Sequence, residues 1–241
     1  MGGKQDNRSK MISHKHKTVF VHIPKVAGQS VEQMYLADLG LNWSERAVLL
    51  LRPKLNTEKG PERLAHLTAA QYTQFGYLSQ DNFQNYFKWA LVRDPYQRAL
   101  SCYHFLGYAR VLSFENFVQN VLPEKIKQQH FFFLPQYDYL HDNQGQLLVD
   151  YVGHLERLDQ ELVYPKEKTG IQGISMPHAN KAAGSWKRVV RIWGEQPSLI
   201  KYFALGHDRK SRKEALTPRA KAGLNQLYAK DFEAFGYTQQ E

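Results

Sequence analysis

The stretch from Thr18 to Leu39, TVFVHIPKVAGQSVEQMYLADL, decides the fold class of this chain. It opens with an apolar, β-branched run of strand length, which the segment Pro24 to Gly28 interrupts. From Ser30 onward, apolar residues recur at intervals of three and four, which is the helical period. The stretch therefore predicts a strand, a tight turn and a helix, the repeating unit of α/β proteins.

A turn of this kind offers several groups that bind anions. The first backbone amides of a helix have no partners inside the helix, and the helix dipole adds partial positive charge there. Lys25 contributes a full charge, Gly28 lets the backbone approach closely, and Ser30 offers a hydroxyl at the start of the helix. The same residues also fit an ordinary βα turn, so the rest of the chain has to decide.

A second unit of the same type follows in the chain. The run YFKWALV (86–92) is strand-like, and a helical pattern begins directly after Arg93-Asp94-Pro95. Asp94 suits a helix N-cap, and Pro95 suits the first turn. Two such units predict a single α/β domain with a central parallel sheet flanked by helices, and with ligands at the carboxyl ends of the strands. A third strand is expected from Leu147 to Leu155, and Thr217 is expected to cap a long closing helix.

The composition favours an anionic partner. The 241 residues carry a formal charge of +9, from 32 Lys and Arg against 23 Asp and Glu. Residues 1–17 predict a basic, flexible tail, and residues 18–241 the folded domain. Cys102 is the only cysteine, no apolar run approaches the length of a membrane span, and the N-terminus lacks a signal peptide. These observations lead us to expect a cytoplasmic location.

Both turns carry a family resemblance. HIPKVAGQS (22–30) resembles the 5′-phosphosulfate loop of the membrane-type carbohydrate sulfotransferases, the family that contains heparan sulfate 2-O-sulfotransferase. ALVRDPYQRALSCY (90–103) resembles their 3′-phosphate loop. The supporting segments, in the order of the family, are AHLTAAQY (65–72), FLPQ (133–136), VDYVGHLERL (149–158), PHANKA (177–182) and LYAKDFEAFGY (227–237).

The resemblance implies a P-loop-like sulfotransferase fold with 3′-phosphoadenosine 5′-phosphosulfate (PAPS) as co-substrate and adenosine 3′,5′-bisphosphate (PAP) as product. The donor has two anionic ends and needs two binding sites. The residues that the resemblance assigns to them are Lys25, Ala27, Gly28, Gln29 and Ser30 for the phosphosulfate, Arg93 and Ser101 for the 3′-phosphate, and Asn180 and Lys181 in a loop that closes over the nucleotide.

The first loop departs from the family at two positions. The family usually has threonine at positions 26 and 29, where this chain has Val26 and Gln29. A hydroxyl expected to touch the donor at position 29 is therefore missing, and the amide of Gln29 could donate a hydrogen bond in its place.

For the chemistry, the resemblance places the catalytic histidine at His66. Sulfuryl transfer needs a base with a pKa near neutrality and a positive charge at the departing phosphate, so we expect His66 to act as general base and Lys25 to stabilise the leaving group. His178 is the alternative base, and His22 is expected to be a packed residue behind the site. The mechanism requires no metal, and the sequence shows no metal-ligand spacing such as HExxH or paired CxxC.

The expected acceptor is a hydroxyl of a carbohydrate or carbohydrate-like molecule, an anionic polysaccharide among them, with no nucleic-acid partner and no membrane span. Two other functions remain open. A P-loop kinase or NTPase requires lysine after the second glycine of its loop, whereas Lys25 precedes Gly28. A non-catalytic polyanion-binding protein would also explain the charge, although no nucleic-acid-binding motif is present.

Overall fold

The computed structural model describes residues 12–171, 192, 194 and 215–241. The chain divides into two compact units, one formed by residues 1–92 with 138–179 and the other by residues 93–137 with 180–241. The predicted residues Asn180 and Lys181 and the alternative base His178 lie outside the described residues.

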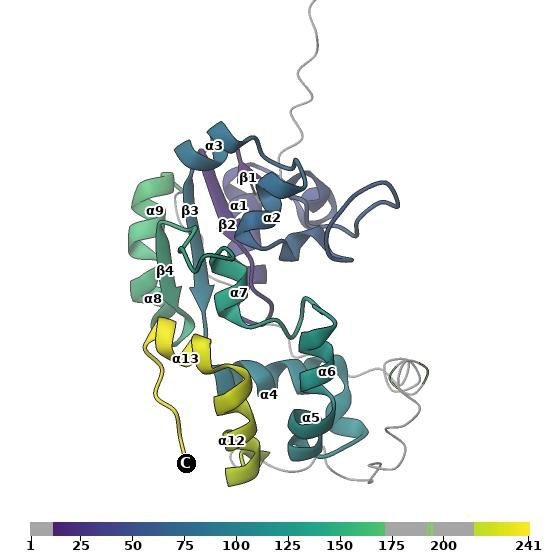
Figure 1. The fold of residues 1–241 in the computed structure, drawn as a ribbon. Helices are drawn as coiled ribbons and strands as arrows, with labels where there is room; N and C mark the ends of the chain where they lie inside the picture. Colours follow the sequence, from purple (N-terminus) through teal and green to yellow (C-terminus); the bar gives the residue numbers. More distant parts are fainter. Residues whose placement is uncertain (1–11, 172–191, 193, 195–214) are drawn as a thin grey trace, which may run out of the picture. The chain divides into compact units, whose positions relative to one another are not determined.

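A four-stranded sheet forms the centre of the first unit (Figure 1). Its strands are β1 (Ile12–Ser13), β2 (Thr18–Val21), β3 (Phe87–Val92) and β4 (Tyr151–His154), and they lie in the order β1-β2-β3-β4. Strands β2, β3 and β4 are parallel, with Val21 opposite Ala90 and Ala90 opposite Val152, whereas β1 is antiparallel to β2. The predicted α/β class with a parallel sheet is therefore confirmed, and β2 and β3 end at the same edge.

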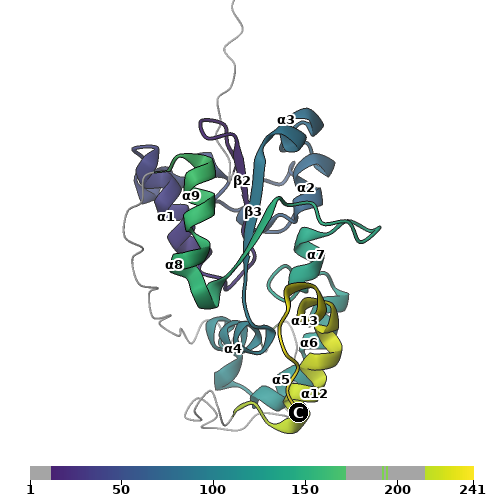
Figure 2. The same ribbon diagram turned by 90° about the vertical axis from the view of Figure 1, so that its left-hand side faces the viewer.

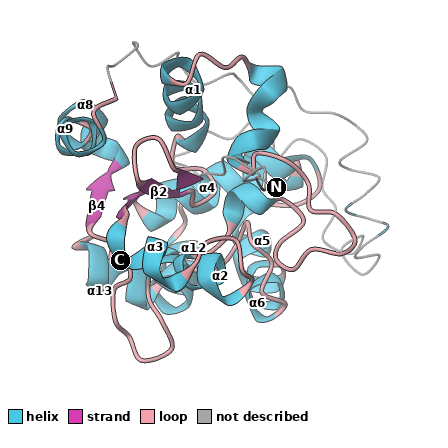
Figure 3. Ribbon diagram, turned by 90° about the horizontal axis from the view of Figure 1, so that it is seen from above, coloured by secondary structure: helices cyan, strands magenta, loops and turns pink. Residues whose placement is uncertain are grey.

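Helices cover both faces of this sheet. Figure 2 shows α1 (Gly28–Asp38), α8 (Leu158–Glu161) and α9 (Val163–Thr169) on one side, and α2 (Ala69–Gln74) and α3 (Gln80–Asn85) on the other. The view from above in Figure 3 gives the same arrangement. Short 3₁₀ helices complete the unit, namely η1 (Trp43–Leu49), η2 (Leu64–His66) and η4 (Leu155–Arg157).

Residues 12–17, which the charge pattern assigns to the basic tail, form the first strand and the turn into β2. In that turn, Lys15 and His16 both contact the carboxylate of Asp38 at the end of α1, at 2.8 and 2.7 Å. Basic residues here fold against the helix that follows β2, because an acidic partner is available.

The core of the first unit joins the sheet to α1 through aromatic side chains. Trp89 and Phe20 are fully buried, and their ring centroids lie 4.6 Å apart. The indole N–H of Trp89 donates to the hydroxyl of Tyr35 at 3.0 Å, which satisfies the polar group of a buried tryptophan. Burial raises the pKa of the Tyr35 hydroxyl to about 12.

The second unit consists of helices in its described part. Its elements are α4 (Pro95–Leu106), η3 (Tyr108–Arg110), α5 (Phe114–Asn120), α6 (Leu122–Lys127), α12 (Pro218–Leu227) and α13 (Ala229–Phe235). They surround one apolar core, which includes Leu100, Phe117 and Leu224. α7 (Gln136–Leu140) comes after α6 in the chain and leads to β4.

Prolines and caps set the helix boundaries of this unit. Pro123 lies in the first turn of α6, where a proline needs no backbone N–H partner. The closing helix is capped by Thr217 as predicted, but it is divided at Tyr228. The hydroxyl of Tyr228 donates to the carbonyl of Phe133 at 3.0 Å. Across the described part of the chain, none of the helices has the length and apolar character needed to cross a bilayer.

Candidate functional site

The turn between β2 and α1 has an unusual backbone. Lys25 has φ 73°, and Ala27 has φ 62° and ψ 19°, so both residues adopt the left-handed conformation. A residue with a side chain adopts this conformation at a cost of about 1–3 kcal/mol, and such strain concentrates at ligand-binding sites. The turn that the sequence predicts to bind an anion therefore has a strained, left-handed backbone at Lys25 and Ala27.

The beginning of α1 carries positive potential. Its N-cap is Ala27, whose side chain makes no capping hydrogen bond, and its first turn contains no acidic residue. The amide of Ser30 donates to the carbonyl of Ala27 at 3.0 Å, and the amides of Gly28 and Gln29 come before it. With Lys25 partly exposed beside them, these groups can bind an anion through amides, a dipole and an ammonium group.

Gly28 has a packing role that the sequence did not reveal. A Cβ added at Gly28 would lie 1.9 Å from Nε2 of His22, a distance that no side chain tolerates. The sequence analysis assigned this glycine to the approach of the donor, whereas in the structure its Cα faces the imidazole ring of His22. Gly28 is therefore required by the protein's own packing, whether or not an anion also approaches the loop.

His66 is brought to the same loop. It ends η2, is 8% exposed, and its Nδ1 lies 2.9 Å from the backbone carbonyl of His22. A carbonyl only accepts hydrogen bonds, so Nδ1 of His66 must carry the proton of the neutral ring. The basic nitrogen of His66 is then Nε2. This tautomer is the one needed if Nε2 is to accept a proton from a substrate.

His22 itself is buried between these groups. Its ring packs edge-on against the ring of His66, with centroids 4.6 Å apart, and its Nδ1 lies 2.6 Å from Oε1 of Glu32 on α1. The expectation that His22 is a packed residue is in agreement with these contacts. Glu32 looks like an ordinary polar helix position in the sequence, and no signal there marks it as buried.

The second turn, in the second unit, is organised differently. Asp94 caps α4 as predicted, because its carboxylate accepts from the amide of Gln97 at 2.8 Å, and Pro95 begins the helix. Arg93 precedes the cap and Ser101 lies in the second turn of α4, and both side chains are partly exposed. An arginine and a hydroxyl on either side of a capped helix start can bind a phosphate through their side chains.

The backbone of Arg93 is fixed by a residue that sequence reasoning missed. The side chain of Gln136, which is 0% exposed, accepts from the amide of Arg93 at 2.9 Å and donates to its carbonyl at 2.8 Å. Asp231 in turn accepts from the amides of Gln136 and Tyr137, at 2.9 and 2.8 Å. Gln136 belongs to the FLPQ segment, which the family resemblance includes without assigning a role to this glutamine.

Arg98, on α4, is buried and has a structural role. It is 1% exposed and donates to the carbonyl of Leu134 at 2.9 Å, directly before α7. Burial raises the pKa of the nearby Asp231 to about 6, although the positive charge of Arg98 and the backbone hydrogen bonds act in the opposite direction. Arg98 thus compensates a buried carboxylate that supports Gln136.

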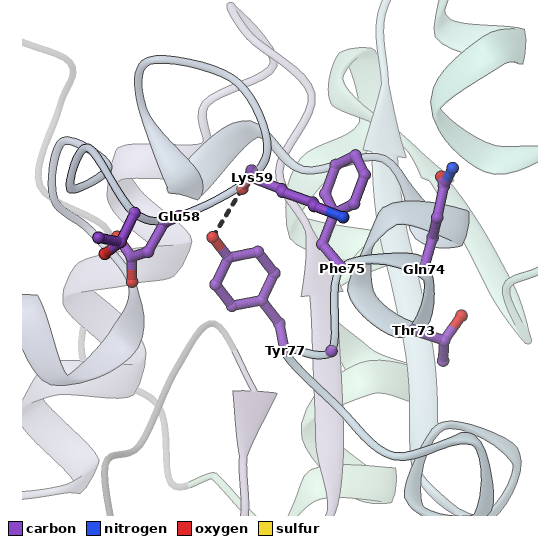
Figure 4. Close-up of a pocket in the computed structure, with 8 residues that line it drawn as sticks. Glu58, Lys59, Thr73, Gln74, Phe75 and Tyr77 are labelled. Atoms are coloured by element: carbon purple, nitrogen blue, oxygen red, sulfur yellow. Dashed lines mark hydrogen bonds between the residues drawn. The ribbon is translucent and has the colours of Figure 1, made fainter.

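A surface hollow of about 490 Å³ lies elsewhere in the first unit, and Figure 4 shows it. Its lining comes from the loop that contains Glu58 and Lys59 and from the end of α2, where the Tyr77 hydroxyl donates to the carbonyl of Lys59 at 2.7 Å. It contains none of the predicted site residues. Its charged lining residues are Glu58, whose carboxylate is paired with Arg52 at 2.6 Å, and Lys59, and this lining does not by itself indicate a reaction.

Comparison with known proteins adds one match. A family model described as the sulfotransferase family matches residues 8–238, which is nearly the whole chain. Neither the curated proteins nor the solved structures provide a match. The matched range contains both turns, His66 and Gln136.

Proposed function

The chain belongs to the sulfotransferase family, and we propose that it transfers the sulfuryl group of PAPS to a hydroxyl of a carbohydrate or carbohydrate-like acceptor. The observation that carries the proposal lies in the first unit. A strained turn with Lys25 at an uncapped helix start is tied, through the carbonyl of His22, to a buried histidine of defined tautomer.

In this proposal the first turn binds the 5′-phosphosulfate. The amides at the start of α1 and the ammonium group of Lys25 supply the positive potential, and Ser30 and Gln29 supply further donors. Because Gln29 is exposed and replaces a family threonine, its contact with the donor is an adjustment particular to this chain.

The second turn binds the 3′-phosphate through the side chains of Arg93 and Ser101. The carboxylate of Asp94 already accepts from the start of α4, so this helix start is not open to an anion in the same way as α1. Gln136 holds the backbone of Arg93 and so limits the positions that the guanidinium can reach. Asn180 and Lys181 remain proposed nucleotide contacts on the family pattern.

The reaction that we propose is an in-line transfer. The acceptor oxygen attacks sulfur, the bond between sulfur and the bridging oxygen of the 5′-phosphate breaks, and Nε2 of His66 takes the hydroxyl proton. The products are a sulfate ester and PAP. Lys25 balances the negative charge that develops on the departing oxygen, which is the kind of stabilisation that most lowers such barriers.

The acceptor follows from the family resemblance and from the positive charge of the chain. In the aromatic-rich segment 128–145, Phe133 and Tyr139 are 1% and 0% exposed and belong to the packing. Phe131 is also buried, and it stacks on His130 with ring centroids 5.2 Å apart. We therefore propose a hydroxyl acceptor without assigning this segment to it.

The test is to incubate the protein with radiolabelled PAPS and a panel of neutral glycans, anionic polysaccharides and small alcohols. We expect label in at least one hydroxyl acceptor, no transfer by H66A, and PAP as the nucleotide product. Hydrolysis of ATP with magnesium and no turnover of PAPS would instead indicate the kinase or NTPase alternative. Salt-dependent binding of polyanions without any transfer would indicate the non-catalytic alternative.

A further inference from the structure

A buried pair of titratable side chains lies behind the first turn. His22 and Glu32 are 6% and 4% exposed, and Nδ1 of His22 lies 2.6 Å from Oε1 of Glu32. Nδ1 of His22 has no hydrogen-bond partner among the residues that the structure describes. The contact with Glu32 therefore places a carboxylate directly against a buried imidazole ring.

The ring of His22 is enclosed by the other groups of the site. It stacks on Phe20, with centroids 5.8 Å apart and planes at 25°, and meets His66 edge-on. Gly28 faces it so closely that a Cβ there would overlap the ring. His22 therefore contacts both the first residue of α1 and the proposed base, and its ring cannot turn without moving one of them.

Stability alone is a poor explanation for such a pair. Removing a carboxylate and an imidazole from water costs free energy that their mutual attraction often fails to recover, and apolar side chains of similar volume would hold the fold as well. Glu32 acts on its surroundings through charge: burial and the negative charge of Glu32 both raise the pKa of Tyr72 on α2. His66 from η2 contacts the ring of His22, and Tyr72 from α2 feels the charge of Glu32.

We propose that His22, held in place by Glu32, is a positioning residue that orients His66 as the general base; this inference rests on the proposed function. The carbonyl of His22 holds the Nδ1 proton of His66, and the ring of His22 sets the plane of the His66 ring. Glu32 fixes the ring of His22 from the side of α1. Because Gly28 packs on the same ring, a displacement of the donor loop would also displace the ring of His22 and, through it, the ring of His66.

The first experiment separates positioning from simple support of the fold. E32Q preserves the shape of the side chain and removes its charge, and E161Q, a partly buried carboxylate of the same unit bound to Tyr151 and Arg157, is the matched control. We expect E32Q to lower kcat by about 10- to 100-fold, with the affinity for PAP and the KM for PAPS changed less than about twofold. E161Q should retain the wild-type kcat.

The same substitution is then made in the H66A background. If Glu32 acts through His66, E32Q changes the residual single-turnover rate of H66A by less than about twofold. Equal losses in the two backgrounds, or a wild-type kcat for E32Q, would overturn the proposal. These rates measure the chemical step. A general loss of folded protein would lower the rate by the same factor in the wild-type and H66A backgrounds, so equal losses identify it.

The second experiment needs no turnover and compares the wild type with E32Q. Nitrogen-15 NMR of histidine-labelled protein reports which ring nitrogen of His66 carries the proton. We expect a single Nδ1-protonated tautomer in the wild type and, in E32Q, a mixture of tautomers. An Nε2-protonated or averaged His66 in the wild type would overturn the positioning role, even if sulfotransfer is found. Absence of transfer to every acceptor, with a fixed His66 tautomer, would instead count against the proposed function.

Discussion

The helices that follow β2 and β3 begin in different ways. α1 starts from Ala27 in a left-handed conformation, with no side-chain cap and no acidic residue in its first turn. α4 starts from Asp94, whose carboxylate accepts from the amide of Gln97, and Pro95 occupies its first turn. The first helix start is strained and electropositive, whereas the second is relaxed and compensated by its own carboxylate.

This difference indicates that two anions would be bound by different chemistry. At α1 the backbone amides and the dipole remain the main attraction, and Lys25 adds to them. At α4 the carboxylate of Asp94 already opposes the dipole, so an anion depends on the side chains of Arg93 and Ser101. Anion binding at the start of α1 should weaken most when charge is removed from the turn. Anion binding at the start of α4 should weaken most when the backbone of Arg93 loses the hydrogen bonds that hold it.

The largest effect is expected for Lys25. K25A should lower kcat by about 10²- to 10³-fold, because the charge that balances the departing phosphate is lost. The melting temperature should stay at the wild-type value, since the side chain is partly exposed. K15A, which removes the same charge from an exposed lysine in the turn between β1 and β2, is the control for rate and stability. A K25A rate within tenfold of the wild type would contradict the role of Lys25.

The next effect concerns the support of the second turn. Q136L should lower the free energy of unfolding by about 3 kcal/mol, because it leaves a partly buried amide and carbonyl of Arg93 without their partner. It should also weaken PAP binding. Chemical denaturation measures the first and calorimetry the second. Q119L, which removes a surface glutamine that donates to the carbonyl of Arg219, should change the free energy of unfolding by less than about 0.5 kcal/mol.

Asp231 should make the second unit sensitive to pH. Its pKa is raised from 3.8 to about 6, so the folded state binds a proton that the unfolded state has released between these values. The stability that this group contributes is complete below pH 4 and is lost as the pH rises to about 6, by up to about 1.4 kcal/mol per pH unit. The unfolding free energy of the wild type minus that of D231N should therefore be most positive below pH 4 and should fall as the pH rises to about 6. A difference independent of pH would refute this.

The smallest effect is expected for the cap. D94A should lower the free energy of unfolding by about 1 kcal/mol, and D94N, which can still accept from the amide of Gln97, by only a few tenths. The affinity of D94A for PAP should not fall, because a negative charge near the proposed 3′-phosphate site has been removed. A tenfold loss of PAP affinity in D94A would mean that the capped start of α4 itself helps to bind the nucleotide, contrary to the difference between α1 and α4 described above.

The sequence predicted those features of the fold that depend on neighbouring residues. Apolar runs identified β2 and β3, the helical period identified α1 and α4, and Asp94 and Thr217 were recognised as caps because capping depends on residues within one turn. The division of the closing helix at Tyr228 was missed, since the apolar periodicity continues across it.

Features that depend on distant packing could not be predicted in the same way. Gln136 lies 43 positions from the Arg93 backbone that it holds, and Glu32 faces a histidine that belongs to the preceding turn. Gly28 was recognised as necessary, but the reason for it, the ring of His22, became visible only in three dimensions. The roles of Lys25, His66, Arg93 and Ser101 remain predictions that the variants above test.

The most direct test compares two ligands that differ by one phosphate. Calorimetry with PAP and with adenosine 5′-phosphate is carried out on the wild type, K25A and R93A. We predict that R93A weakens PAP binding strongly and leaves adenosine 5′-phosphate unchanged, whereas K25A weakens both ligands by the same factor. If R93A weakened the two ligands equally, or if K25A affected neither, the assignment of the two turns to the two ends of the donor would be wrong.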